Sequence, residues 1–394
     1  MRSLAAARLL AAALLAVALL SGCGVAAAPT AAHALTSSRT IAGTRSAKRP
    51  AFLALSFTAV SVTHWWVLGA VPCGARDCLS VKTTANGGAT FRSLPAPPGT
   101  FAPGEAPTES SIRFADATDG WVFGPKLYAT HDGGLHWTAI RMPGAVGQLQ
   151  PGLGRVYAVV APAAPCAATG TCSARTPRPQ LWQTLPSDDR WTVDRAAGAV
   201  SSELAVHGTS VWVVDATLTR DGYAPGTQLL DSANAGETFA VEPQQITGIY
   251  CEYSPVTAAY LWAYCSGGHF MFPFISTDGG AHFTAIGSQT ARITPVGYAN
   301  GSGLIAASAS TAIAASDLPV PRLGTPLIRS TDGGARWQVA AAQPSRDGQW
   351  SLIGFTTPEV GYALWQSSAH GYPTSELWRT VDGGARWAPV KALT

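Results

Sequence analysis

Short apolar segments separated by turn-forming residues recur along the chain from about residue 51 to its end. One repeat divides into four such segments, at residues 111–115, 120–124, 126–130 and 135–141. The apolar run that opens the second segment recurs loosely at residues 360–365. Short segments of this kind, bounded by Gly, Asp and Ser, predict β-strands joined by tight turns. Each repeat is therefore predicted to be a sheet of four antiparallel strands.

A turn motif ends the third segment of each repeat. It has the form Thr/Ser-x-Asp-Gly-Gly-x-x-aromatic, and its four strong copies are marked by Asp132 and Trp137, Asp278 and Phe283, Asp332 and Trp337, and Asp382 and Trp387. Asn86 and Asn234 replace the Asp in two weaker copies, and a seventh copy at residues 184–191 has lost the Asp and both Gly. The aromatic positions are 44 to 54 residues apart, and this period is typical of a propeller blade.

The seven copies predict an all-β fold, a seven-bladed β-propeller of four-stranded antiparallel blades in a ring that protects most strand edges. A ring of six blades is the alternative, if the degenerate third repeat is a long insertion. Seven is favoured because the interval between motifs would otherwise increase to about a hundred residues, far from a blade period.

The motif resembles the Asp-box, or BNR repeat, which the sialidase superfamily also carries. The chain resembles most the photosystem II assembly-factor-like propellers, on the Gly-Trp of residues 120–121 and the T-x-DGG-x-x-W turns. This resemblance implies a non-enzymatic scaffold that binds a partner protein. The Asp carboxylate can accept backbone N–H bonds within its loop, and Gly supplies positive φ. We therefore interpret the boxes as structural, not as catalytic or metal-binding.

The first 22 residues predict a secretory signal. Arg2 and Arg8 precede an unbroken Leu, Ala and Val run at residues 9–20, which is too short to span a bilayer comfortably. The following Leu-Ser-Gly-Cys resembles a bacterial lipobox, which implies that Cys23 becomes the lipidated N-terminus. The alternative is an ordinary signal peptide cut farther along. We expect residues 1–22 to be removed, residues 23–50 to form a flexible tether, and residues 51–394 to form the propeller.

Six further cysteines fall into three local pairs: Cys73 and Cys78, Cys166 and Cys172, and Cys251 and Cys265. Export by the predicted signal favours disulfides between these neighbours. The alternative, a metal site, requires CxxC-type spacing with further Cys or His nearby, and the pairs lack it. We expect no metal and no cofactor. The expected location is the outer face of the cell membrane, or the periplasmic face of a membrane, through the lipid anchor.

Composition supports this class. Of the 394 residues 47% are hydrophobic and 12% are charged, and 41 Gly and 28 Pro are spread along the chain, which favours many turns over helices. The formal net charge is only +3, so nothing attracts nucleic acid strongly. We expect a monomer that does not bind nucleic acid.

A binding face is predicted opposite the Asp-boxes, where the longer loops between second and third strands lie. Long loops held on a rigid scaffold are common binding sites. The predicted loops are residues 72–78, 161–180, 215–228, 266–271, 308–326 and 366–375. Tolerated surface insertions are the alternative explanation of these loops. The possible contact residues on them are Arg76, Asp77, Arg220, Asp221, Tyr223, His269, His370 and Tyr372.

Catalytic residues are not recognisable. A sialidase requires three arginines, a Tyr–Glu nucleophile pair and an acid Asp, and the nearest arginine motif, at residues 292–295, has an inserted Thr. We therefore predict a non-enzymatic extracytoplasmic lipoprotein that acts as a binding or assembly scaffold for a partner protein or glycan. The alternative is a secreted glycoside hydrolase of the exo-sialidase type, which would use two carboxyl groups flanking the scissile bond.

Overall fold

The computed structural model describes residues 50–103, 105, 109–162, 178–197, 200, 203–216, 227–242, 246, 250–267, 270–286, 304–315, 325–345, 348–367 and 373–393. Contacts divide the chain into two units, residues 1–45 and 46–394, and every described residue belongs to the second. The predicted signal peptide, Cys23 and nearly all of the tether lie outside the described residues. Within the described part, none of the helical structure is long and apolar enough to cross a membrane.

Seven antiparallel sheets form the second unit. Blade 1 contains β1 (Leu53–Ala59), β2 (Trp65–Cys73), β3 (Arg76–Thr84) and β4 (Arg92–Leu94), with β5 (Thr100–Phe101) paired to β3. Blade 2 contains β6 (Ser111–Phe114), β7 (Gly120–Phe123), β8 (Leu127–Thr130) and β9 (Thr138–Ile140). Blade 3 contains β10 (Gly144–Pro151), β11 (Val156–Pro162), β12 (Gln180–Thr184) and β13 (Thr192–Val193). Blade 4 contains β14 (Leu204–His207), β15 (Ser210–Ala216), β16 (Thr227–Ser232) and β17 (Ala240–Val241).

Blade 5 contains β18 (Tyr250–Pro255), β19 (Leu261–Gly267), β20 (Phe270–Ser276) and β21 (Thr284–Ala285). Blade 6 contains β22 (Ile305–Ala306), β23 (Ala312–Ala315), β24 (Leu327–Ser330) and β25 (Gln338–Ala341). Blade 7 contains β26 (Gln349–Phe355), β27 (Gly361–Ser367), β28 (Thr374–Thr380) and β29 (Ala388–Pro389). A short 3₁₀ turn, Lys391–Leu393, follows β29.

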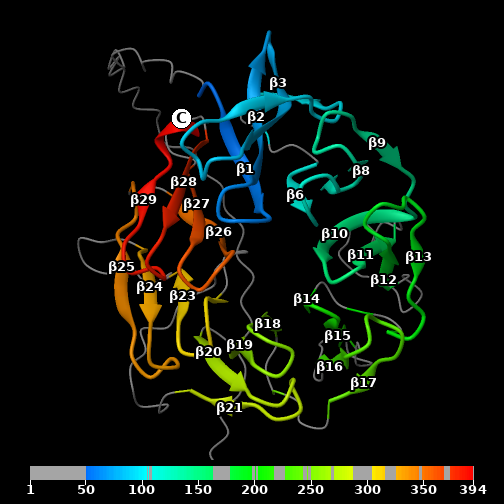
Figure 1. Cartoon of the computed structure of the whole chain (residues 1–394), viewed down its shortest axis with the longest axis vertical. Coiled ribbons are helices and arrows are strands. Elements are labelled where there is room, and N and C mark those ends of the chain that lie inside the picture. The colour runs from blue at the N-terminus through cyan, green and yellow to red at the C-terminus, as the bar shows by residue number, and fades with distance from the viewer. Residues whose placement is uncertain are drawn as a thin grey trace, which may run out of the picture. The chain divides into compact units, whose positions relative to one another are not determined.

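The prediction of a seven-bladed propeller is confirmed, and the six-bladed alternative is wrong. Figure 1 shows the blades around a common centre, with the first strand of each blade on the inside and the last strand outside. The degenerate third repeat forms a complete four-stranded blade of its own. The turn motif is therefore not required in every blade for the blade to form.

The four strands predicted for one repeat correspond to β6, β7, β8 and β9. The first three end within one residue of their predicted limits, but β9 begins at Thr138 instead of residue 135. The difference has a local cause. Leu135 and His136 donate backbone N–H bonds to Asp132 Oδ1, both at 2.9 Å, so they belong to the turn and not to the strand.

The core consists of side chains packed between neighbouring blades. In each blade, one residue of the second strand pairs with the Thr or Ser that opens the turn motif. The side chain of the next residue along the second strand is at most 2% exposed in all seven blades. These side chains are Trp66, Trp121, Tyr157, Trp212, Trp262, Ile313 and Tyr362. Trp66, for example, stacks on Phe114 of blade 2 with the ring centres 3.9 Å apart. Six of these seven side chains are aromatic, and aromatic residues bury much apolar area at a blade junction.

The ring closes between blades 1 and 7. The backbone N–H of Ala54 donates to Ser375 Oγ at 2.6 Å, and Gln366 Nε2 donates to the Ala54 carbonyl at 3.2 Å. Trp65 and Tyr362 pack edge to face across the same junction at 4.3 Å between ring centres. Residues 297 to 321 positions apart in the sequence thus hold the first and last blades together.

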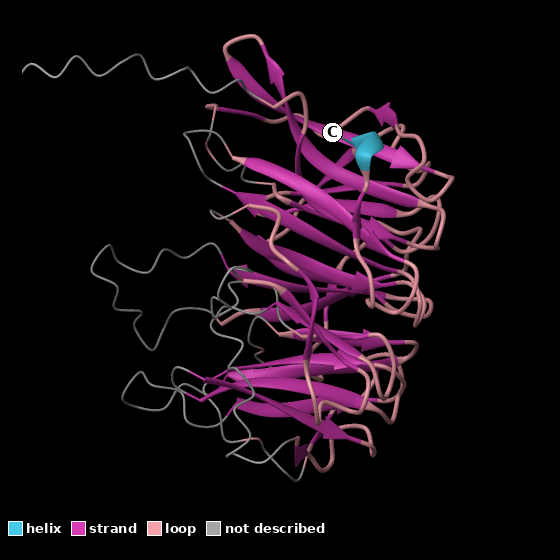
Figure 2. Cartoon of the chain, turned by 90° about the vertical axis from the view of Figure 1, so that its left-hand side faces the viewer, coloured by secondary structure: helices cyan, strands magenta, loops and turns pink. Residues whose placement is uncertain are grey.

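Each blade has turns on two opposite faces (Figure 2). One face carries the turns between the first and second strands and between the third and fourth strands of each blade, and we call it the turn face. The two kinds of turn are bonded to one another: Gly133 N donates to Thr118 O at 2.9 Å, and Gly383 N donates to Glu359 O at 2.8 Å. The predicted position of the motif between third and fourth strands is confirmed.

Two of the loops predicted on the opposite face are much shorter than expected. β2 and β3 continue their pairing as far as Cys73 and Arg76, so only residues 74–75 connect them. β19 and β20 likewise pair as far as Gly267 and Phe270. The sequence-based limits 72–78 and 266–271 were wrong because the polar and Gly residues there continue the strands instead of ending them.

Candidate functional site

The Asp residues of the turn motif bond to their own turns. In blade 7, Asp382 Oδ1 accepts hydrogen bonds from Thr380 Oγ1 and Arg386 N, both at 2.9 Å. Thr380 Oγ1 in turn accepts a bond from Gly384 N at 2.9 Å. Asp132, Asp278 and Asp332 accept the corresponding hydrogen bonds in their blades. These carboxylates thus satisfy backbone and hydroxyl donors that would otherwise lack partners.

The two weaker copies use the same geometry. Asn86 Oδ1 accepts from Thr90 N, and Asn234 Oδ1 accepts from Thr238 N, each at 3.0 Å. An amide oxygen has the acceptor that this turn requires. The negative charge of Asp is therefore not needed for the turn to form.

The third repeat has a different turn and an additional tie to blade 2. Its Thr184 Oγ1 donates to the Asp188 carbonyl at 2.6 Å. From the blade 2 turn, His131 Nδ1 lies 2.6 Å from Asp119 Oδ1, and its Nε2 lies 3.2 Å from Asp189 Oδ1 of blade 3. Burial lowers the pKa of His131, but the bonds to Asp119 and Asp189 outweigh it, so the pKa is raised above 6.5. Sequence reasoning missed this bridge because its two carboxylates are 70 residues apart.

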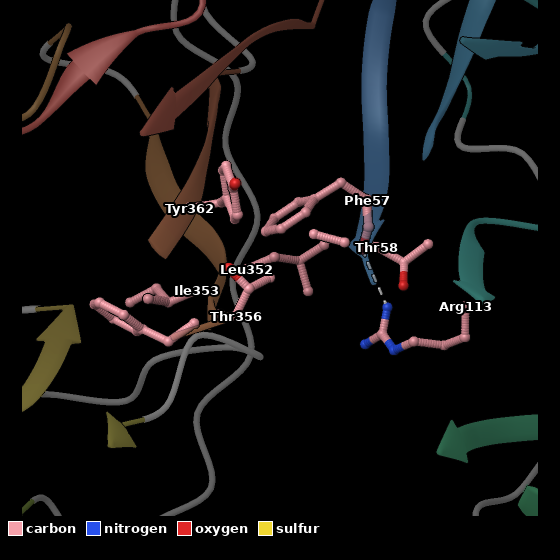
Figure 3. Close-up of a pocket in the computed structure, with 10 residues that line it drawn as sticks. Phe57, Thr58, Arg113, Leu352, Ile353, Thr356 and Tyr362 are labelled. Atoms are coloured by element: carbon pink, nitrogen blue, oxygen red, sulfur yellow. Dashed lines mark hydrogen bonds between the residues drawn. The ribbon is translucent and has the colours of Figure 1, made fainter. Parts of the chain in front are cut away.

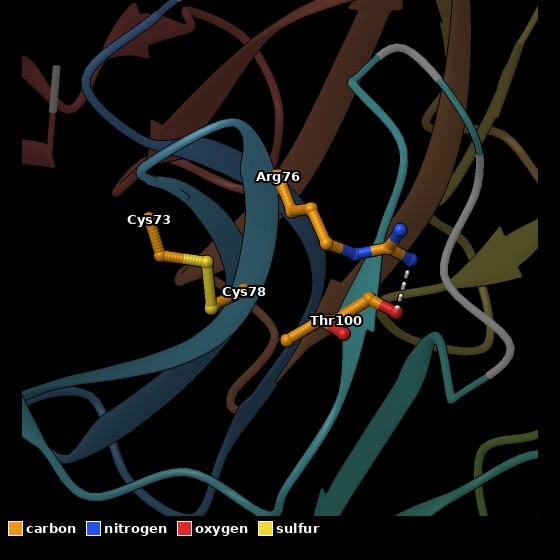
Figure 4. The surroundings of a disulfide bond; sticks show 4 residues. All are labelled: Cys73, Arg76, Cys78 and Thr100. Carbon is orange, nitrogen blue, oxygen red and sulfur yellow. Dashed lines mark hydrogen bonds between the residues drawn. A yellow bond between two sulfur atoms is a disulfide. The ribbon is translucent and has the colours of Figure 1, made fainter.

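Among the predicted contact residues, Arg76 is held by its own blade. It follows the turn of the β2–β3 hairpin, and its guanidinium NH2 donates to the Thr100 carbonyl of β5 at 3.1 Å (Figure 4). The neighbouring Asp77 pairs with Phe101 in the ladder. The other predicted contact residues, Arg220, Asp221, Tyr223, His269, His370 and Tyr372, lie outside the described residues, and their role stays a prediction.

Two of the three predicted disulfides are present. Cys73–Cys78 closes the tip of the β2–β3 hairpin (Figure 4), and Cys251–Cys265 joins paired residues of β18 and β19. Cys251 and Cys265 are at most 4% exposed, so the second bridge lies within blade 5 and does not restrain a loop. Cys166 and Cys172 lie outside the described residues.

A cavity of about 130 Å³ lies near the centre of the ring, at the turn-face ends of the first strands of blades 1, 2 and 7. Most of its ten lining residues are apolar, and Figure 3 shows Phe57, Leu352 and Tyr362 facing one another there. Arg113 is the single charged side chain among the ten lining residues. The cavity lies on the face opposite to the loops from which the sequence predicted binding residues.

Arg113 comes from β6, and its guanidinium extends toward the end of β1 (Figure 3). Its NH1 donates to the carbonyls of Ile112 at 2.8 Å and Phe57 at 3.4 Å. Burial lowers the pKa of the guanidinium, and no carboxylate of the described residues pairs with it. Sequence reasoning missed Arg113 because it alternates with buried Ile112 and Phe114, as an ordinary outward-facing strand residue would.

A second unusual group lies on the other side of the ring. Burial raises the pKa of Glu252, on β18, to about 7, and the negative charge of Glu203 adds to the effect. Glu203 is itself buried and lies directly before β14. Two carboxyl groups, one directly before β14 of blade 4 and one in β18 of blade 5, therefore influence one another, and one of them is partly protonated at neutral pH.

A larger cavity, of about 400 Å³, lies between blades 6 and 7 on the turn face. It is lined by residues of β24, β25 and the turn motifs, among them Arg329, Asp332 and Arg336. The Arg329 Nε donates to the Gly383 carbonyl at 2.7 Å, and Asp332 accepts the turn bonds described above. Arg329 thus joins blade 6 to blade 7, and Asp332 is already used within its own turn.

Comparison with known proteins supports the fold. No protein-family model matches the chain, and no curated protein matches it in sequence. Among solved structures, it is similar to YCF48 bound to a D1 peptide, with a TM-score of 0.52 and 18% identity over 84% of this chain and 94% of that one. YCF48 from Cyanidioschyzon merolae gives a TM-score of 0.52 and 14% identity over 84% of this chain and 96% of that one.

A puromycin-hydrolysing peptidase of Mycobacterium tuberculosis gives a TM-score of 0.56 at 12% identity, over 86% of this chain but only 53% of that one. Proteins of different activity thus share this propeller. Identities this low show a common fold and leave the activity to the site.

Proposed function

We propose that this protein is a non-enzymatic binding scaffold that holds a partner protein or a glycan outside the cytoplasm. The observation that carries the proposal is the lining of the central cavity. Its apolar walls and one guanidinium provide contact area and a cation, which are the elements of a binding pocket. No Asp, Glu or His is among its ten lining residues, so the cavity offers no general acid or base.

Tyr362 is the only lining residue that resembles a sialidase nucleophile. Burial raises its pKa to about 12, and its hydroxyl donates to the Val62 carbonyl at 3.4 Å. A phenol with this pKa stays neutral and needs an adjacent base to act as a nucleophile. The described lining contains none.

The similar propellers support a polypeptide as the partner. One of the two YCF48 structures is bound to a D1 peptide, so a ring of this architecture can present a surface that binds a peptide. We propose only that this protein also binds a polypeptide, because at 18% identity the two proteins need not share the same ligand.

The proposed location rests on the N-terminal sequence and on the disulfides. We propose that Cys23 carries the lipid and that the tether of residues 23–50 holds the propeller at the outer membrane face. Cys73–Cys78 and Cys251–Cys265 support this proposal, because disulfides persist mainly in oxidising compartments.

Site-specific photo-crosslinking in intact cells tests the binding function. A photoreactive amino acid is placed at Ile353, in the cavity, and in a control chain at Val241, which is exposed on the outer strand of blade 4. We expect one discrete polypeptide adduct from position 353 and not from position 241. Identical adducts from both positions, or none from 353 together with no binding to a glycan array, would refute the proposal.

The glycoside hydrolase remains a second candidate because of Glu203 and Glu252. A carboxyl group with a pKa near 7 beside a second carboxyl group is what a glycosidase acid requires. Fluorogenic sialosides and a panel of other glycosides test it, with Glu252→Gln as the inactive control. Turnover by the wild type that the variant loses would establish the hydrolase, and no turnover on any glycoside would remove it.

A further inference from the structure

We propose that Arg113 is the anchor of a carboxylate-binding site in the central cavity. The proposal rests on the proposed function for the identity of the natural ligand, and on the geometry of the cavity for the chemistry. A buried charge is costly unless a partner of opposite charge or several hydrogen bonds compensate it. Arg113 is partly buried, and the described residues supply its guanidinium with two backbone carbonyls and no carboxylate.

The hydrogen-bond donors of the cavity that have no protein acceptor indicate that its ligand is an anion. NH1 makes both of the hydrogen bonds that the Arg113 guanidinium has within the described structure, so Nε and NH2 stay available to a ligand. Thr58 lines the same cavity, and its Oγ1 accepts the backbone N–H of Phe114 at 3.3 Å. Its hydroxyl proton has no acceptor among the described residues. A guanidinium edge and a hydroxyl match the two oxygens of a carboxylate.

The walls define what carries the carboxylate. Phe57, Leu352, Ile353 and Tyr362 present apolar surface, with the Phe57 and Tyr362 rings edge to face at 5.9 Å. A cavity of about 130 Å³ is slightly smaller than one that holds benzene, at about 150 Å³. It therefore fits a carboxylate with two or three further carbon atoms. An acidic side chain or the C-terminal residue of a polypeptide has this form, and so does a free short-chain acid.

Thermal unfolding of the full-length protein with a small probe tests the carboxylate site. Sodium butyrate is compared with butyramide, its neutral isostere, at constant ionic strength. A ligand that binds only the folded state raises Tm with its concentration. We expect butyrate to raise the Tm of the wild type and butyramide to have no effect. Equal shifts from both compounds, or no shift from butyrate, would overturn the proposal.

Variants assign the effect to the guanidinium. In Arg113→Met we expect the butyrate response to be lost, while the Tm without ligand stays the same or rises because a partly buried charge with no carboxylate partner has been removed. Arg329→Met is the matched control, since Arg329 also donates to a backbone carbonyl between blades but lies outside the cavity. It should have a lower Tm and an intact butyrate response. A butyrate response that survives in Arg113→Met contradicts the proposal.

Arg113→Lys covers the case in which the Met variant does not fold. It keeps the charge but loses the planar pair of donors, so we expect butyrate to bind about tenfold more weakly, the loss of one charge-assisted hydrogen bond. Wild-type affinity in the Lys variant would overturn the proposal.

Crosslinking from Ile353 then separates the two sources of the carboxylate. If butyrate suppresses the polypeptide adduct, the carboxylate belongs to the partner. If butyrate raises Tm without affecting the adduct, the site takes a free acid and the proposal also holds. An adduct that forms equally in wild type and Arg113→Met, with no butyrate response, refutes the carboxylate site and leaves the binding scaffold standing.

Discussion

The indole Nε1 of Trp66 donates a hydrogen bond of 3.0 Å to the carbonyl oxygen of Gly133. Trp66 belongs to β2 of blade 1 and Gly133 to the turn motif of blade 2, so the bond joins neighbouring blades. Equivalent bonds to the same turn carbonyl come from Trp212 to Gly279, Arg329 to Gly383 and Arg379 to Gly87. The turn motif thus receives a donor from the preceding blade in addition to its own internal bonds.

Two features of this junction require glycine at the second Gly position of the motif. Gly280 has φ of +109°, and a Cβ there would lie 3.0 Å from Leu229 Cδ2. Positive φ disfavours a side chain, and the close approach of the preceding blade leaves no room for one. The DGG sequence is therefore explained by packing between blades as well as by the turn.

Trp66→Phe tests the bond between blades. The substitution removes the donor to Gly133, and we expect it to lower the free energy of unfolding in urea by about 1 kcal/mol more than Trp121→Phe does. Trp121 occupies the same position in blade 2, and its Nε1 has no partner among the described residues. Equal losses in the two variants would show that the bond to Gly133 contributes nothing.

Protonation of the turn carboxylates should lower the stability of the fold at acid pH. Backbone and side-chain hydrogen bonds from His282 lower the pKa of Asp278 to about 2. A lowered carboxyl pKa stabilises the folded state above the unfolded value, near 4, and this contribution disappears as pH falls toward 2. We expect Asp278→Asn to reduce the loss of Tm between pH 5 and pH 2, with little effect at pH 7, since Asn86 and Asn234 support the same turn. Parallel Tm curves of the two proteins would contradict this.

The His131 bridge should weaken the junction of blades 2 and 3 at alkaline pH. The raised pKa of His131 means that its contribution is complete below about pH 6.5 and is lost as pH rises through the folded value. We expect amide hydrogen exchange at residues 185–191, corrected for intrinsic rates, to increase from pH 6 to pH 9. His131→Asn should exchange fast at both pH values. His136→Asn is the control, because His136 contacts only Asp132 of its own turn, and it should behave as the wild type.

The two described disulfides should differ in how much they stabilise the fold and in how easily they are reduced. Loss of Cys251–Cys265, which closes a separation of 14 residues, should lower the free energy of unfolding by about 3 kcal/mol, and loss of Cys73–Cys78, with a separation of 5, by about 2 kcal/mol. Mild reductant should cleave the partly exposed hairpin bridge first, because the blade 5 cysteines are buried. Mass mapping of alkylated cysteines measures the order. Cleavage of Cys251–Cys265 before Cys73–Cys78 would show that burial does not protect the blade 5 disulfide.

The lipid anchor is tested by Cys23→Ser. The variant should leave the membrane fraction and appear in the soluble exported fraction, with an unchanged Tm of the propeller. The tether begins at this residue, and a lipid chain supplies membrane affinity that the described propeller does not need for folding. If the variant still sediments with membranes, the lipobox interpretation is wrong.

The sequence alone determined the fold of this protein. The motifs at Asp132, Asp278, Asp332 and Asp382 repeat at blade spacing, and each specifies a turn through bonds within about five residues, so local chemistry was sufficient to predict seven four-stranded blades. Cys73–Cys78 and Cys251–Cys265 were predictable for the same reason, since each pair lies within one hairpin.

Only the tertiary structure decided where binding chemistry can occur. Arg113, Phe57 and Ile353 belong to blades 2, 1 and 7, and the bridge from His131 to Asp189 joins blades 2 and 3. Closure of the ring brings these residues together over long sequence separations. Burial then withdraws Arg113 in part from water and raises the pKa of Glu252. Neither proximity across blades nor the loss of solvent is encoded in a local pattern, and so the candidate site became visible only in the folded ring.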